Sequence, residues 1–105
     1  MVDNVNGLLG ISAKAGRVIS GYDAVLEKIV KNKVDLIIVA KDASEKTIKN
    51  IKYYCNKYNI DIIIYGDIVN NSKAIGKKNR AIIGIAEKNL ADNIKKVIHG
   101  GVEVG

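Results

Sequence analysis

Residues 36–40 read LIIVA, an unbroken run of aliphatic and mostly β-branched residues. A strand that is apolar on both faces is typical of the centre of a sheet that helices cover on both sides. Two further runs have the same character, DIIIY at residues 61–65 and AIIGIA at residues 81–86, and a shorter strand is predicted over residues 17–19. These runs predict the strands of one buried sheet.

Helical periodicity fills the segments between these strands. It predicts helices over residues 3–15, 20–31 and 89–99, a third helix that Ser44 caps, and a short helix or turn over residues 67–75. Helices alternating with buried strands predict an α/β protein, arranged as a three-layer α/β/α sandwich. Ligands of such folds bind at the carboxyl edge of the sheet. The strand-to-helix junctions expected at this edge are Ser20–Gly21, residues 41–44 and Gly66–Asp67.

The composition limits the number of domains, the partners and the compartment. The 105 residues suffice for one domain, predicted over residues 1–99, and the glycine-rich residues 100–105 are expected to fray. Seventeen Lys and Arg against eleven Asp and Glu give a net charge of +6, which favours a polyanionic partner such as nucleic acid. A single cysteine, no apolar run of membrane-spanning length and no secretion-signal pattern predict a cytoplasmic protein without a membrane partner.

The junction of Ser20 and Gly21 suggests a capping box. Ser20 is predicted to cap the second helix by accepting a hydrogen bond from a backbone N–H of its first turn. Asp23, three residues later, is predicted to accept a second hydrogen bond from the backbone N–H of Ser20. Gly21 keeps the first turn free of a side chain, so that a phosphate could approach the free N–H groups. A sharp turn without a ligand is the purely structural alternative.

Two long stretches carry a resemblance to a known family. They are SAKAGRVISGYDAVLEKIVKNKVDLIIVAKDAS at residues 12–44 and SKAIGKKNRAIIGIAEKN at residues 72–89. Together they resemble the superfamily of ribosomal proteins L7Ae and L30e, most closely its small bacterial YlxQ-type members. The resemblance implies an L30e-like α/β/α sandwich with a mixed four-stranded sheet, which binds RNA, typically the bent element called a kink-turn. It implies no catalysis.

The resemblance also indicates which residues face the RNA. Gly21 matches the family's glycine, whereas Asp23, Ala24 and Glu27 stand where kink-turn binders have Asn, Glu and Lys. Kink-turn specificity is therefore left open. The loop before the last strand is basic where kink-turn binders are aliphatic, which predicts phosphate contacts in place of base contacts. The predicted RNA-binding residues are Arg17, Gly21, Tyr22, Asp23, Glu27, Lys28, Lys41, Gly76, Lys77, Lys78, Asn79 and Arg80.

Other charged and aromatic residues are assigned to the surface or the core. The lysines of the third helix are predicted to form its solvated side; they are Lys46, Lys49, Lys52 and Lys57. Four of the five tyrosines are assigned to packing; they are Tyr53, Tyr54, Tyr58 and Tyr65. No platform of aromatic rings for single-stranded bases is predicted.

No arrangement of residues predicts catalysis, a metal or a cofactor. Asp42 is interpreted as a turn or capping residue, Cys55 as a buried thiol, and His99 as an isolated residue at a helix end. The predicted function is therefore non-enzymatic binding of structured RNA by a monomer, with ribosomal RNA and the ribosome as candidate partners. The alternative is a protein-interaction module of the same fold that has lost kink-turn recognition.

Overall fold

The computed structural model of the chain describes residues 4–100, and its helices and strands alternate as predicted. The strands are β1 (Val18–Ser20), β2 (Leu36–Val39), β3 (Asp61–Ile64) and β4 (Ile82–Ile85). The helices are α1 (Asn4–Lys14), α2 (Tyr22–Val30), α3 (Glu45–Tyr58), α4 (Ile68–Ala74), α5 (Lys88–Lys95) and a π-helical turn, η1 (Lys96–Gly100). No helix among the described residues is both long and apolar enough to cross a membrane.

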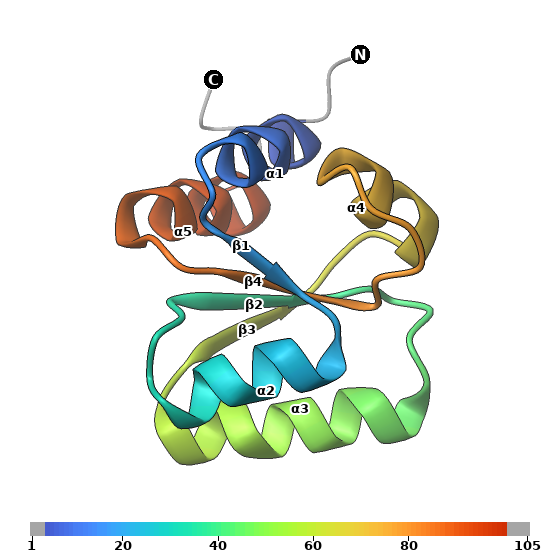
Figure 1. Ribbon diagram of the computed structural model, residues 1–105, viewed down its shortest axis with the longest axis vertical. Helices are drawn as coiled ribbons and strands as arrows, with labels where there is room; N and C mark the ends of the chain where they lie inside the picture. The colour runs from blue at the N-terminus through green and yellow to red at the C-terminus, as the bar shows by residue number, and fades with distance from the viewer. Residues whose placement is uncertain (1–3, 101–105) are drawn as a thin grey trace.

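The four strands form one mixed sheet in the order β1-β4-β2-β3. β2 and β3 are parallel, whereas β4 is antiparallel to both of its neighbours, β1 and β2. Helices α1, α4 and α5 cover one face of the sheet, and α2 and α3 cover the other (Figure 1). The predicted three-layer sandwich with a mixed four-stranded sheet is confirmed.

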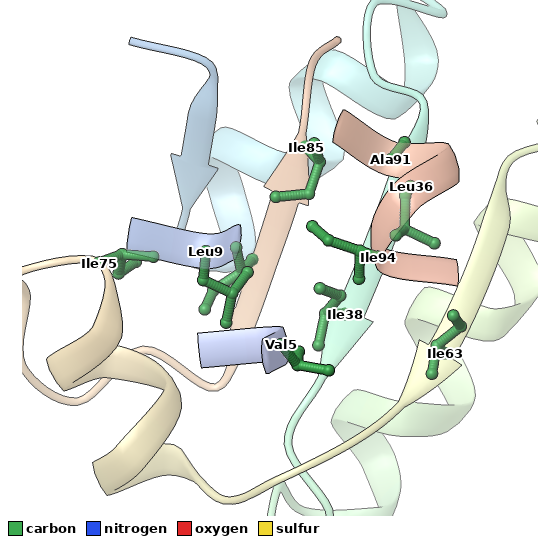
Figure 2. Packing of buried hydrophobic residues seen from close by; sticks show 10 residues of the cluster. Val5, Leu9, Leu36, Ile38, Ile63, Ile75, Ile85, Ala91 and Ile94 are labelled. Carbon is green, nitrogen blue, oxygen red and sulfur yellow. The ribbon is translucent and has the colours of Figure 1, made fainter. Parts of the chain in front are cut away.

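Each face of the sheet packs against its own hydrophobic cluster. Side chains of β2 alternate between them, so that Leu36 and Ile38 belong to one cluster while Ile37 and Val39 belong to the other. Figure 2 shows Leu9 of α1, Ile94 of α5 and Ile38 of β2 as members of the first cluster. A fully buried aliphatic side chain contributes about 1.5–3 kcal/mol. An unbroken apolar strand therefore holds helices on both faces at once.

The ends of α3 and α5 follow local capping chemistry, and the chain after β4 differs from the prediction in two ways. Ser44 caps α3 as predicted, because its Oγ accepts a hydrogen bond from Thr47 N at 3.1 Å. Glu87 caps α5, which therefore begins at Lys88 and ends at Lys95 instead of spanning residues 89–99.

The second difference concerns the end of the chain. The wider turn η1 follows α5 and includes Gly100, which the prediction assigned to the frayed tail. Two adjacent apolar residues of this turn, Val97 and Ile98, both pack against the first cluster. The rest of the predicted tail, residues 101–105, lies outside the described residues.

Candidate nucleic-acid interface

Four loops and helix starts meet at the edge of the sheet where β1, β2 and β3 end and β4 begins. Backbone hydrogen bonds join them, from Gly21 N to Ile82 O at 3.0 Å and from Lys41 N to Gly66 O at 2.9 Å. The same segments converge on the right of Figure 1. The prediction that the three strand-to-helix junctions gather at one edge is confirmed. We call this edge, residues 20–23, 40–44, 65–67 and 76–81, the carboxyl rim.

The start of α2 at this rim differs from the predicted capping box. Ser20 is the last residue of β1, where it pairs with Ile83, so its backbone is committed to the sheet. The cap position is occupied by Gly21, at φ 94° and ψ 152°, and no side chain caps the helix. The assignment of Ser20 and Asp23 to a capping box is therefore wrong. Glycine suits this position because a positive φ strains residues that carry a Cβ.

Gly21 lies directly against the basic loop that precedes β4. We use the name basic loop for residues 76–81, GKKNRA. A Cβ atom added to Gly21 would lie 3.4 Å from Nη1 of Arg80. Arg80 is half-buried, and its Nε is buried with no hydrogen-bond partner in the described part of the chain. Two predicted site residues that are far apart in sequence thus meet at the start of α2.

The basic loop is held in one conformation by a buried serine of α4. Ser72, which is 1% exposed, accepts a hydrogen bond from Arg80 N at 2.7 Å and donates one to Arg80 O at 3.3 Å. Its own carbonyl accepts from Lys77 N at 2.9 Å. Gly76 and Asn79 turn the chain in left-handed conformations, at φ 73° and 56°. The role of Ser72 was not predicted, because a serine in a short helix carries no sign of a partner eight residues away.

Two aspartates join the other loops of the rim. Asp42 Oδ1 accepts a hydrogen bond from Ile68 N at 2.9 Å, so a residue of the β2–α3 loop holds the start of α4. Its prediction as a turn or capping residue is confirmed, although the helix it serves is α4. Asp67 accepts from Asn70 N at 2.8 Å, and this bond to the backbone lowers the pKa of the Asp67 carboxyl. Both acids are therefore engaged with the backbone of α4.

Positive charge is concentrated on α4 and the basic loop. Residues 68–86 include Lys73, Lys77, Lys78 and Arg80 but no Asp or Glu. Within the described residues, none of these four makes an ion pair. A hollow of about 310 Å³ opens here, and its walls are Val69, Ser72, Lys73, Lys77, Lys78 and Asn79. An anion would meet exposed lysines at this place without displacing a carboxylate.

The other predicted site residues divide into two groups. Lys41 is exposed on the rim, Asp23 is exposed in the first turn of α2, and Tyr22 is half-buried against the second cluster. Arg17 lies at the opposite edge of the sheet, where its carbonyl accepts a hydrogen bond from Ala86 N at 2.9 Å.

Glu27 and Lys28 also lie away from the rim, in the last turn of α2. Glu27 forms an ion pair with Lys31 at 3.1 Å, and this hydrogen bond lowers the pKa of its carboxyl. Of the twelve predicted residues, the structure therefore does not bring Arg17, Glu27 and Lys28 to the rim.

Residues suited to other chemistry are dispersed or buried. Within residues 4–100, no group of three or more His, Cys, Asp or Glu is placed to hold a metal ion. Cys55 is buried as predicted, and burial raises the pKa of its thiol to about 11.

Comparison with known proteins places the chain in a family. Residues 3–97 match the Ribosomal protein L7Ae/L30e/S12e/Gadd45 family, which covers nearly the whole chain. The chain belongs to this family. The membership confirms the resemblance seen in the sequence and the prediction that the protein is not an enzyme.

Individual relatives are similar to this chain over most of their own length. RNA-binding protein YlxQ of Enterococcus faecium is 30% identical over 93 residues, which is 89% of each chain. Large ribosomal subunit protein eL30 of Euphorbia esula is 30% identical over 97 residues, covering 90% of this chain and 87% of the relative. A solved structure of a protein with unknown function from Bacillus halodurans C superposes with a TM-score of 0.88 at 27% identity, covering 90% and 96%.

Proposed function

We propose that this protein binds structured RNA through its carboxyl rim, without catalysis. Relatives of similar length that are named as RNA-binding or ribosomal proteins support the proposal. The observation that carries it is the contact between Gly21 and Arg80. This contact joins an open helix start, with its free N–H groups, to an acid-free basic loop that Ser72 fixes in place. Helix starts and fixed cations are both favourable partners for phosphate groups.

The residues of the rim suit recognition by shape and phosphate more than by base sequence. Lys41, Lys77 and Lys78 offer exposed ammonium groups, and Arg80 offers a guanidinium that is already positioned. Asn79 adds an amide that can both donate and accept. Structured RNA is recognised largely through phosphates, backbone hydroxyls and unpaired bases, because the A-form major groove is too narrow to read.

A kink-turn is the finer form of the proposal, and α2 is where it is weakest. Asp23 can accept but not donate hydrogen bonds, and Glu27 pairs with Lys31 instead of offering a cation to RNA. We further propose that residues 1–99 act as one monomeric RNA-binding domain in the cytoplasm, with ribosomal RNA as the candidate partner.

Calorimetric titration with a kink-turn RNA and with a plain duplex of equal length tests this function. We expect tighter binding to the structured RNA, and a slope of several units when log K is plotted against log salt concentration. The variant K77A/K78A/R80A should bind about a hundredfold more weakly, which is about 2.7 kcal/mol, because three phosphate contacts are lost. The control K14A/K33A/K96A removes the same charge from exposed lysines outside the rim.

The outcomes separate RNA binding from its alternatives. Equal affinity for both RNAs would keep RNA binding and discard the kink-turn. No binding to either RNA at moderate salt would overturn the proposal and favour the protein-interaction module. Equal losses in the triple variant and its control would show that overall charge, and not the rim, determines affinity.

A further inference from the structure

The outward side of α3 carries a second concentration of positive charge, away from the basic loop. Residues 46–60 contain four lysines and no Asp or Glu. We use the name α3 lysine face for Lys46, Lys49, Lys52, Lys57 and the tyrosine among them, Tyr53. All five residues are exposed, and Tyr53 is 60% exposed. The prediction that these lysines form the solvated side of α3 is confirmed, but their charge remains unexplained.

Two other helices of this protein, α2 and α5, pair some of their lysines with acids. In α2, Lys31 pairs with Glu27 at 3.1 Å. In α5, Lys88 lies 3.6 Å from Asp92, and Lys95 lies 2.6 Å from Asp61. Among the described residues, no lysine of the α3 lysine face makes an ion pair. Lys14 of α1 and Lys73 of α4 are likewise unpaired among the described residues, so α3 differs by gathering four such lysines on one helix.

The spacing of the α3 lysines does not favour helix stability. Lys46, Lys49 and Lys52 follow one another at intervals of three residues, which places like charges side by side on a helix. Such pairs destabilise a helix by about 0.2–0.5 kcal/mol each. The acid of α3, Glu45, stands four residues before Lys49, but the two make no ion pair among the described residues. An external polyanion would relieve the same repulsion.

Tyr53 adds an aromatic ring to the charged surface. Lys49 and Lys57 are four residues before and after it, so both lie on the same side of the helix. Tyr54 packs edge-on against Tyr53, with ring centroids 5.1 Å apart, and itself contacts the second cluster. Lys57 Nζ itself lies 5.7 Å from the centroid of the neighbouring Tyr58 ring. The exposed ring of Tyr53 is thus supported by Tyr54 on a helix side that also carries lysines.

We propose that the α3 lysine face is a second RNA-binding surface, which holds an RNA segment other than the one bound at the carboxyl rim. Protein–protein interfaces are depleted in lysine, whereas phosphate contacts are commonly made by lysine and arginine. The lysines span about 16 Å along the helix, enough to follow several phosphates. Helix α3 lies with α2 in the layer on one side of the sheet, whereas the rim lies at the sheet edge (Figure 1).

The proposal rests on the proposed function, since both take RNA as the ligand, and makes the protein a bridge between two RNA segments. A mobility-shift experiment tests it with the full chain. The protein is first saturated with a labelled kink-turn RNA, and a plain RNA duplex carrying a second label is then added. We expect the first complex to shift again as the duplex binds.

Charge-matched variants decide where the duplex binds. The variant K46Q/K49Q/K52Q/K57Q removes the charge of the face while keeping residues of similar helix propensity. The control K14Q/K33Q/K88Q/K96Q removes four exposed lysines outside both surfaces. We expect the α3 variant to bind the duplex at least tenfold more weakly than the control, with a salt slope lower by about three to four. Affinity for the first RNA should remain within about threefold of the control.

Each outcome bears on one proposal. Equal duplex affinity in the α3 variant and the control would overturn the second surface and leave an acidic protein as the candidate partner of α3. Failure of the unmodified protein to bind the kink-turn RNA would overturn that finer form of the proposed function only. The duplex titration of the two variants would then still test the α3 lysine face by itself.

Discussion

The basic loop and the α3 lysine face are both rich in lysine and free of acids, but they hold their charges differently. In the loop, Ser72 bonds to both backbone groups of Arg80, and the guanidinium lies against Gly21. On α3, flexible lysine side chains project from a regular helix and make no ion pair within the described residues. In the loop, contacts with α4 and α2 determine where the charge of Arg80 lies. On α3, only the spacing of the lysines along the helix determines where their charges lie.

The difference separates two ways of binding a polyanion. Cations whose positions are fixed before binding can discriminate between RNA shapes, because a poorly fitting backbone cannot draw them into place. Mobile lysines contribute affinity that depends on salt and little on sequence or shape. We therefore expect changes in the loop to affect discrimination and changes in α3 to affect general affinity. Three substitutions challenge this distinction, from the largest expected effect to the smallest.

Replacing Ser72 by alanine should have the largest effect on stability and on discrimination. The variant S72A leaves the N–H of Arg80 without its partner in a partly buried position, which costs about 1–3 kcal/mol. Urea denaturation measures this loss, and paired titrations measure the ratio of affinities for the kink-turn RNA and the plain duplex. We expect that ratio to fall towards one.

The variant I94V is a matched control for S72A. It removes one buried methylene from α5, with a loss of about 0.5–1.5 kcal/mol, and lies outside both the carboxyl rim and the α3 lysine face. It should lower stability while leaving the ratio of RNA affinities unchanged. If I94V reduced the ratio as much as S72A, discrimination would depend on overall stability and the distinction between the two regions would be lost.

Replacing Lys49 by glutamate should have a smaller effect, and with the opposite sign. The variant K49E turns the repulsion with Lys46 and Lys52 into attraction and adds one repulsion with Glu45, four residues before it. The balance of these pairs should make α3 more stable by about 0.4–1 kcal/mol. Thermal unfolding should show a midpoint a few degrees higher, while duplex affinity falls. The variant K49Q should lie between the two proteins in both measurements. A lower midpoint for K49E would show that the lysines stabilise the helix.

The smallest expected effect concerns the pH dependence of Asp67. Its pKa is lowered by the bond from Asn70 N, so the carboxylate stabilises the folded state above its ordinary pKa of 3.8 and loses this contribution as the pH falls through the lowered value. Asparagine is an equally good N-cap. The variant D67N should therefore match the unmodified protein near pH 6 and lose less stability below about pH 4. Parallel urea curves across this range would contradict the assignment.

Local sequence signals were sufficient to predict most of the elements but not their order in the sheet. LIIVA at residues 36–40 was recognisable as a central strand because both of its faces are buried. Ser44 was recognisable as a cap because its partner, Thr47, is three residues away. The position of β4 between β1 and β2 depends on pairings between residues as far apart as Val18 and Ile85, which periodicity does not encode. Only the family resemblance implied a mixed sheet.

Site residues were predicted correctly where their role depends on neighbours in the sequence. They were missed or misassigned where their role depends on contacts with residues far away in the sequence. The basic loop was visible as the run GKKNR at residues 76–80. Ser20 suggested a helix cap, but its pairing with Ile83 keeps it in β1. Asp42 bonds to Ile68, 26 residues away, so its role in joining two loops required the folded chain. Arg17 was grouped with the rim because it is near Gly21 in sequence, yet β1 separates the two.

The position of β4 has a consequence for how the protein is made. Within the described sheet, β1 pairs with β4 alone. At the rim, Gly21 N donates a hydrogen bond to Ile82 O, and Ala40 N donates one to Ala81 O. A nascent chain that has emerged only as far as β3 therefore has neither a partner for its first strand nor an assembled carboxyl rim. Such long-range closure is slow compared with local helix formation. The carboxyl rim is thus completed only after β4 has been synthesised and has paired with β1 and β2.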